Sequence, residues 1–203
     1  ILNENFSDQL PLSPLHWIIS DKERSITLES VKTGIKVYNN PVGVLTNNPT
    51  FDYQLFNLNN YIALTNGTPQ NTFATNNNLK LEQYSRGIGA MGLPGDYSSM
   101  SRFVRATFVK LNSVSGDGEN ESIGQFFHIL QSVAMPRGCV KVDKDSYAIT
   151  IYSSCCNTDR GIYYYTTYNN IQINAVDMYK ENLNGENLIT YPLKTQQAIN
   201  YQN

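Results

Sequence analysis

The sequence has little of what several large protein classes require. Its 203 residues include only two histidines and three cysteines, and Cys155 and Cys156 are adjacent rather than spaced as zinc ligands are. The odd number of cysteines has no framework spacing, which argues against a disulfide-stapled secreted domain. We therefore expect a cytoplasmic protein without a metal site.

An excess of either charge is also lacking. Fifteen Lys and Arg residues stand against 17 Asp and Glu residues, which gives a formal net charge of -2. This balance provides no electrostatic footprint for nucleic acid or an anionic membrane. No apolar run approaches the roughly 20 residues of a membrane span, and no signal peptide is visible. Because the chain begins with Ile1 instead of methionine, we expect it to be part of a longer chain.

Short β-branched runs separated by turn residues come first. They read "LHWIIS", "SITLES", "GIKVYNN" and "PVGVLTN", and they lie at residues 15–20, 25–30, 34–40 and 41–47. The turns "SDKER" and "VKTG" separate the first three runs, so the pattern predicts an antiparallel meander with a fourth strand after it.

A helix is predicted to follow that fourth strand. Asn48 is a good N-cap and Pro49 a good first helical residue. Apolar residues then recur at helical spacing, at Phe51, Leu55, Leu58 and Ile62. This leaves Asn47 as the last strand residue, at a sheet edge where a site could form.

The rest of the chain returns to β-structure after two more helices. A polar, turn-rich excursion at 66–78 precedes a helix that should begin at Ser98 or Ser99. A second helix should cover "ESIGQFFHILQSVA" at 121–134, and strands should follow in 147–156, 161–170 and 172–178. Two β regions around a helical middle predict a layered α+β fold.

Arg102 lies in the first of these two helices. We expect the apolar stripe of this helix to consist of Met100, Val104, Phe108 and Leu111, which places Arg102 on the opposite side of the helix. Ala106 and Val109 flank the arginine there, so both faces of the helix should be covered. Arg102 is then either a solvated arginine or a partly buried cation that needs a polar or anionic partner.

Three other features have a structural and a functional interpretation. "GIGAMG" at 87–92 matches a dinucleotide-binding pattern, but Pro94 breaks the helix that such a loop needs, which favours a packing or substrate loop. His16 and His128 favour structural roles, although a Cys–His nucleophile pair stays open. The apolar segment holding Phe6, Leu10 and Leu15 is either the edge of the core or the wall of an apolar ligand site.

Five stretches together resemble the choloylglycine hydrolase family. They read "LHWIISD", "GVLTNNPTFDYQLFNLNNY", "GLPGDYSSMSRFVRATF", "FFHILQSVAMPRG" and "GIYYYTTYNNIQINAVDM". The resemblance implies an N-terminal nucleophile (Ntn) hydrolase fold, an αββα four-layer sandwich of antiparallel sheets. It covers the C-terminal two-thirds of such an enzyme, so residues 1–203 should be the C-terminal part of a single domain.

The resemblance also implies an activity and roles for individual residues. It implies hydrolysis of the amide bond of glycine- or taurine-conjugated bile acids by an N-terminal cysteine that this chain lacks, with no cofactor and in a homotetramer. Asn47 matches the side chain that donates to the oxyanion, and Arg102 matches the arginine beside the nucleophile. Phe6, Leu10 and Leu15 match part of the steroid pocket.

Two alternatives remain. A penicillin V acylase of the same family would use the same chemistry with a different acyl pocket. A non-catalytic β-rich binding module would explain the missing nucleophile in another way. On the leading interpretation the 203 residues alone should be inactive.

Overall fold

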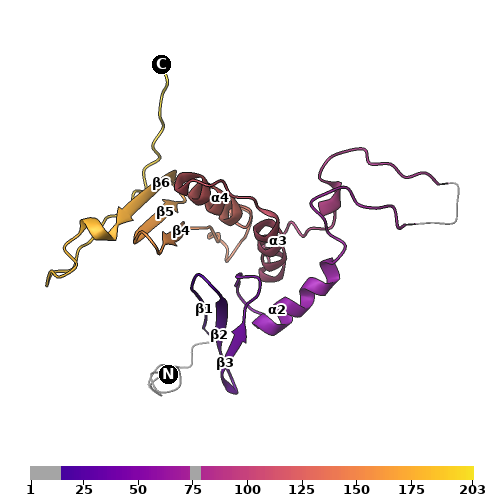
Figure 1. Ribbon diagram of the computed structural model, residues 1–203, viewed down its shortest axis with the longest axis horizontal. Helices are drawn as coiled ribbons and strands as arrows, with labels where there is room; N and C mark the ends of the chain where they lie inside the picture. The colour runs from indigo at the N-terminus through magenta and orange to yellow at the C-terminus, as the bar shows by residue number, and fades with distance from the viewer. Residues whose placement is uncertain (1–14, 74–78) are drawn as a thin grey trace. The chain divides into compact units, whose positions relative to one another are not determined.

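The computed structural model of the protein describes residues 15–73 and 79–203 (Figure 1). Contacts within the chain form two compact units, Ile1–Asn112 and Ser113–Asn203, and each is described by itself. Each unit contains one three-stranded antiparallel sheet. No helix in the described ranges is long and apolar enough to cross a membrane.

The sheet of the first unit is the predicted meander. Its strands are β1 (His16–Ser20), β2 (Ser25–Val31) and β3 (Gly34–Asn39), and β2 lies in the middle. The turn between β1 and β2 closes where Asp21 Oδ1 accepts hydrogen bonds from the main-chain N–H groups of Glu23 and Arg24. The turn residues therefore set the register, as the sequence predicts.

Residues 41–47 do not form the predicted fourth strand. The side chain of Asn40 is buried and donates to Thr27 Oγ1 at 3.0 Å and to the Val44 carbonyl at 2.9 Å, while its Oδ1 accepts from Gly43 N–H at 2.7 Å. These bonds occupy main-chain groups that a β-ladder would use. Gly43 also takes a left-handed φ of 58°, which interrupts a strand.

The helix after this segment starts later than predicted. It is α2 (Phe51–Asn57), which continues as the short 3-10 helix η1 (Leu58–Tyr61), and its N-cap is Thr50. Asn48 is therefore not the cap. The first helical N–H, that of Phe51, donates to the buried Glu29 Oε1 of β2 at 2.9 Å, so the sheet caps the helix. Ile62 lies beyond the helix and is 85% exposed.

Helix α3 (Ser99–Asn112) begins where the sequence predicts, but it buries a different stripe. Its buried residues are Ser101, Phe103, Val104, Ala106 and Thr107, and the predicted stripe residue Leu111 is 62% exposed. The Phe51 ring lies 5.7 Å from that of Tyr38 and 6.1 Å from that of Phe103. This aromatic cluster joins β3, α2 and α3 around one core.

Between α2 and α3 the described part of the chain is mostly irregular. Residues 66–73 and 79–86 contain no helix or strand, and residues 74–78 of the predicted excursion lie outside the described ranges. The glycine-rich "GIGAMG" stretch forms only the 3-10 helix η2 (Ile88–Ala90). Gly89 packs so closely that an added Cβ would lie 2.2 Å from the Gly67 carbonyl oxygen, which makes this a packing loop.

The second unit contains α4 (Glu119–Gln131) and the sheet β4 (Tyr152–Asn157), β5 (Ile162–Thr167) and β6 (Asn170–Asp177), followed by the 3-10 helix η3 (Met178–Lys180). Glu119 joins α4 to the sheet, because its Oε1 accepts from Asn157 Nδ2 at 2.7 Å and from Tyr164 OH at 2.9 Å. The order of β, helical and β regions confirms the predicted α+β class.

Candidate active site

Asn47 and Arg102 meet in the first unit, although 55 residues separate them. Asn47 lies in the irregular segment before α2, and Arg102 lies in the first turn of α3. The Nη2 atom of Arg102 donates a hydrogen bond to Asn47 Oδ1 at 2.6 Å. The two residues that the sequence singles out from separate stretches thus form one cluster.

This contact determines which way the Asn47 amide points. A guanidinium group only donates hydrogen bonds, so the atom that faces Arg102 must be the amide oxygen. The Nδ2 group then points away, and it makes no hydrogen bond to any residue in 15–73 or 79–203. Asn47 therefore presents a fixed N–H donor from an exposed position, the kind of group that stabilises a developing oxyanion.

Of the two interpretations of Arg102, the structure agrees with the second: the arginine is a partly buried cation with a polar partner. Burial lowers the pKa of its guanidinium below the usual value, and the nearby charge of Arg105 adds to this effect. The group stays charged near neutral pH, because the ordinary arginine pKa lies far above it. Its Nε also donates to the Tyr97 carbonyl at 3.1 Å, which fixes the plane of the guanidinium.

Two further residues hold Asn47, and the sequence interpretation missed both. Gln54 Nε2 and Ser99 Oγ each donate to the main-chain carbonyl of Asn47. Gln54 lies three positions after Phe51, on the face of α2 that the apolar pattern predicts to be buried. A polar residue on that face is the signal that could have identified it.

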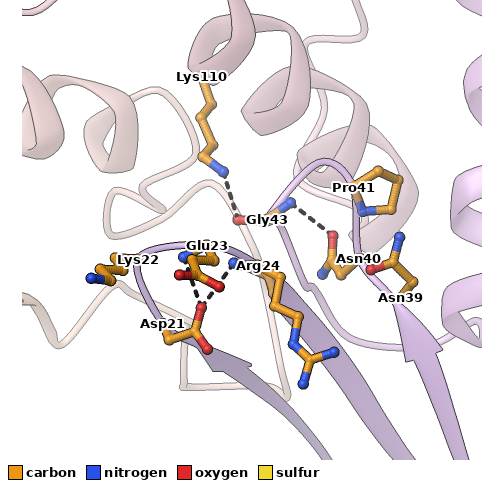
Figure 2. A pocket seen from close by; sticks show the side chains of 10 residues that line it. Asp21, Lys22, Glu23, Arg24, Asn39, Asn40, Pro41, Gly43 and Lys110 are labelled. Atoms are coloured by element: carbon orange, nitrogen blue, oxygen red, sulfur yellow. Dashed lines mark hydrogen bonds between the residues drawn. The ribbon is translucent and has the colours of Figure 1, made fainter.

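The other end of the irregular segment is held by the last turn of α3. Figure 2 shows Lys110 reaching Gly43 in the loop that follows β3. The Lys110 Nζ donates to the carbonyls of Val42 at 2.7 Å and Gly43 at 3.3 Å. Burial lowers the pKa of Lys110. The polar cavity there, of about 390 Å³, is lined by Asp21, Lys22, Glu23, Arg24, Ser25, Asn39, Asn40, Pro41, Gly43 and Lys110. It includes neither Asn47 nor Arg102.

Helix α3 therefore holds both ends of the segment from Val42 to Asn47. Ser99 at the start of the helix donates to the Asn47 carbonyl, and Lys110 near its end donates to the Val42 carbonyl. These two contacts make the segment run antiparallel to α3.

The predicted pocket residues are less well placed. Phe6 and Leu10 lie outside the described residues. Leu15 immediately precedes β1, where its carbonyl accepts from Ser30 N–H at 3.0 Å and its side chain is 52% exposed. Their role in an apolar pocket stays a prediction.

The cysteines and histidines form no alternative site among the residues that the structure describes. No group of three or more His, Cys, Asp or Glu residues there could hold a metal ion. Burial raises the pKa of the Cys155 thiol to about 11, which keeps it protonated at neutral pH, the opposite of an activated nucleophile. His16 Nδ1 lies 3.6 Å from Glu29 Oε1, and His128 is exposed on α4.

Comparison with known proteins identifies the family. A family profile described as linear amide C-N hydrolases, choloylglycine hydrolase family, matches residues 1–191. The chain belongs to the choloylglycine hydrolase family. A bile salt hydrolase/transferase from Lactiplantibacillus plantarum is 60% identical over 97% of this chain, and one from Clostridium perfringens is 41% identical over all of it.

Solved structures of related enzymes show the same fold. A conjugated bile acid hydrolase variant from Clostridium perfringens covers 97% of this chain with a TM-score of 0.83 and 41% identity. This likeness shows the Ntn-hydrolase fold that the resemblance implies. A penicillin V acylase from Agrobacterium tumefaciens covers 88% of the chain with a TM-score of 0.62 at 23% identity, and it supports the fold alone.

The chain corresponds to only part of each relative's length. The chain spans about 60% of the length of the curated choloylglycine hydrolases named above, and 60% of the Clostridium perfringens crystal chain.

Proposed function

We propose that the protein hydrolyses the amide bond of bile acids conjugated to glycine or taurine. The observation that carries the proposal is the Asn47 amide, whose oxygen is held by Arg102 so that its N–H group is free to donate. Membership in a family of linear amide hydrolases supports the reaction class and favours an enzyme over a non-catalytic binding module. The printed names of the relatives support the substrate.

In the proposed mechanism the nucleophile is a cysteine at the N-terminus of a segment that precedes these residues. Residues 1–203 then form the C-terminal part of a single domain. Of the cysteines in this chain, Cys139, Cys155 and Cys156 all lie in the second unit, and the most buried of them has a raised pKa. The raised pKa keeps the Cys155 thiol protonated near neutral pH, which does not suit it to act as the nucleophile.

The thiolate sulfur adds to the scissile carbonyl carbon, and the carbonyl oxygen takes up the negative charge. The Asn47 N–H donates to that oxyanion, while the fixed charge of Arg102 favours both the thiolate and the anionic intermediate. Collapse breaks the C–N bond, and the amine leaves with the proton taken from the thiol. Water then attacks the thioester carbon, the C–S bond breaks, and the bile acid is released.

An amine in place of water would give a new amide from the same thioester. Both relatives reported above are named hydrolase/transferase, which supports this second outcome for the same intermediate. A penicillin V acylase would share all these steps, so the acyl pocket decides between the substrates. We propose that Phe6, Leu10 and Leu15 form part of a steroid pocket.

We further propose a cytoplasmic homotetramer that uses no cofactor and binds neither nucleic acid nor a membrane. Three free cysteines and a net charge of -2 support this setting. The excursion at 66–78 is the proposed oligomer contact, because it is polar and rich in turn residues. Deleting it from the full-length enzyme should change sedimentation before it changes turnover, and a deletion variant that remains fully tetrameric would contradict this assignment.

The central test compares the natural full-length protein with residues 1–203 alone. Glycine release from glycocholate is measured for both, with penicillin V as the competing substrate. We expect the full-length protein to prefer glycocholate and the 203-residue piece to be inactive. Steady-state turnover by the piece would refute the missing-nucleophile mechanism, and a preference for penicillin V would refute the substrate.

A further inference from the structure

We propose that Gln54 and Ser99 are positioning residues that fix the oxyanion donor through the main-chain carbonyl of Asn47. This inference rests on the proposed function, because it takes Asn47 as the donor. It extends that function to two side chains that touch neither the substrate nor the Asn47 amide. One comes from α2 and the other from α3.

The main-chain oxygen of Asn47 is fully occupied. Ser99 Oγ donates to it at 2.6 Å and Gln54 Nε2 at 3.2 Å. A carbonyl oxygen has two lone pairs, and the two donors use both. With Arg102 on the side-chain oxygen, three residues from two helices determine where the Asn47 N–H donor lies.

The distances favour one assignment of the hydroxyl hydrogens around this carbonyl. Thr46 Oγ1 donates to the Ser99 carbonyl at 3.1 Å, which uses its single hydrogen. The Ser99 hydroxyl has a single hydrogen too, and Asn47 O at 2.6 Å is a closer acceptor than Thr46 Oγ1 at 2.9 Å. The two hydrogens of Gln54 Nε2 are then shared among three oxygens, Asn47 O at 3.2 Å, Thr46 Oγ1 at 3.2 Å and Ser99 Oγ at 3.1 Å. Gln54 therefore contacts the Asn47 carbonyl and both hydroxyl groups beside it.

The burial of Gln54 indicates that the role of this side chain is to donate hydrogen bonds through its N–H groups. Its side chain is 1% exposed, and its Oε1 is buried without a hydrogen-bond partner in the described part of the chain. An unpaired buried amide oxygen destabilises the fold relative to an apolar side chain of similar shape. A purely structural role would be better served by methionine. The contacts that glutamine adds are those to Thr46, Asn47 and Ser99.

The experiment measures kcat, KM and melting temperature in the full-length enzyme with glycocholate. Gln54→Met and Ser99→Ala are each made in the wild-type and in the Asn47→Ala background. The matched control is Thr107→Val, since Thr107 also carries a hydroxyl group on α3, but it is buried and its Oγ1 has no partner among the described residues. Ser99→Thr tests whether a hydroxyl group at this position is enough to preserve kcat.

A displaced donor should reduce turnover more than binding. We expect Gln54→Met and Ser99→Ala to lower kcat by roughly 10- to 100-fold, because a misplacement near 1 Å can cost about 100-fold. KM should change little, and Ser99→Thr and Thr107→Val should stay near wild type. In the Asn47→Ala background the same substitutions should change kcat by less than about twofold, since coupled residues are not additive.

The outcomes separate this inference from the function on which it rests. Additive losses in the Asn47→Ala background, or lower melting temperatures with unchanged kcat, would overturn the positioning role of Gln54 and Ser99. If Asn47→Ala itself keeps the wild-type kcat, the oxyanion role of Asn47 fails, and the inference fails with it. Should Gln54→Met not fold, Ser99→Ala alone decides the question.

Discussion

Two substitutions at Asn47 should both lower the turnover rate strongly but should differ in their effect on stability. Asn47→Ala removes the proposed oxyanion donor, and such a loss lowers kcat by about 10²–10³, or roughly 3–4 kcal/mol of transition-state stabilisation. It also removes the 2.6 Å acceptor of Arg102. Because Asn47 is exposed, water can replace that acceptor, so the loss of stability should stay below about 1 kcal/mol.

Asn47→Asp sharpens the contrast. A carboxylate at this position accepts from Arg102 at least as well as the amide oxygen does, so the melting temperature at pH 7 should equal or exceed that of wild type. It has no N–H group, however, and its charge opposes the oxyanion. We therefore expect kcat to fall at least as far as in Asn47→Ala, with little change in KM.

The assay combines steady-state glycine release with thermal unfolding of the full-length enzyme. Asn48→Ala is the matched control, because Asn48 is exposed and makes no hydrogen bond within the described residues. Since Asn48 is not the N-cap of α2, both the kcat and the melting temperature of the Asn48→Ala enzyme should stay near wild type. If Asn47→Asp retains near wild-type kcat, or if both Asn47 variants lose only stability, the residue is structural and the reasoning is refuted.

Three further predictions concern charges around the site. Arg102→Ala should raise the pKa of the nucleophilic thiol, so the pH profile of its alkylation by iodoacetamide should shift to higher pH, and an unmoved profile would return Arg102 to a structural role. A hydrogen bond from the Ser101 hydroxyl is the main cause that lowers the pKa of Asp96 from 3.8 to about 2. The ionised Asp96 carboxylate therefore stabilises the folded state fully above about pH 4, and this contribution disappears as the pH falls through 2. Asp96→Asn should therefore lower the melting temperature at pH 7, and the two curves should converge near pH 2; a constant difference would contradict this. Glu29→Ala leaves the buried N–H of Phe51 without an acceptor and should cost about 1–3 kcal/mol in urea unfolding, whereas Glu29→Gln, which keeps an acceptor, should cost less.

Local patterns in the sequence were sufficient for part of the regular structure. Turn residues and β-branched runs predicted the three strands of the first sheet, and the serines after Pro94 predicted the start of α3 at Ser99. These predictions succeed because turn chemistry and capping act over a few residues. The family was also evident from the sequence, through several stretches taken together.

Tertiary contacts decided the elements next to the site. Asn40 reaches Thr27 and Val44, which turns a predicted strand into an irregular segment. Glu29 caps α2 from 22 residues away, which moves the helix start past Asn48. Both partners are buried polar groups whose hydrogen-bonding needs compete with local preference.

The arrangement of the candidate site depended on packing in the same way. The sequence by itself selected Asn47 and Arg102, but the direction of the Asn47 amide is set by a guanidinium 55 residues away. Gln54 and Ser99 entered the site only once α2 and α3 were placed side by side with the segment between them. A hydrogen bond needs its two groups within about 3 Å and correctly aimed, and that geometry exists only after the helices have packed.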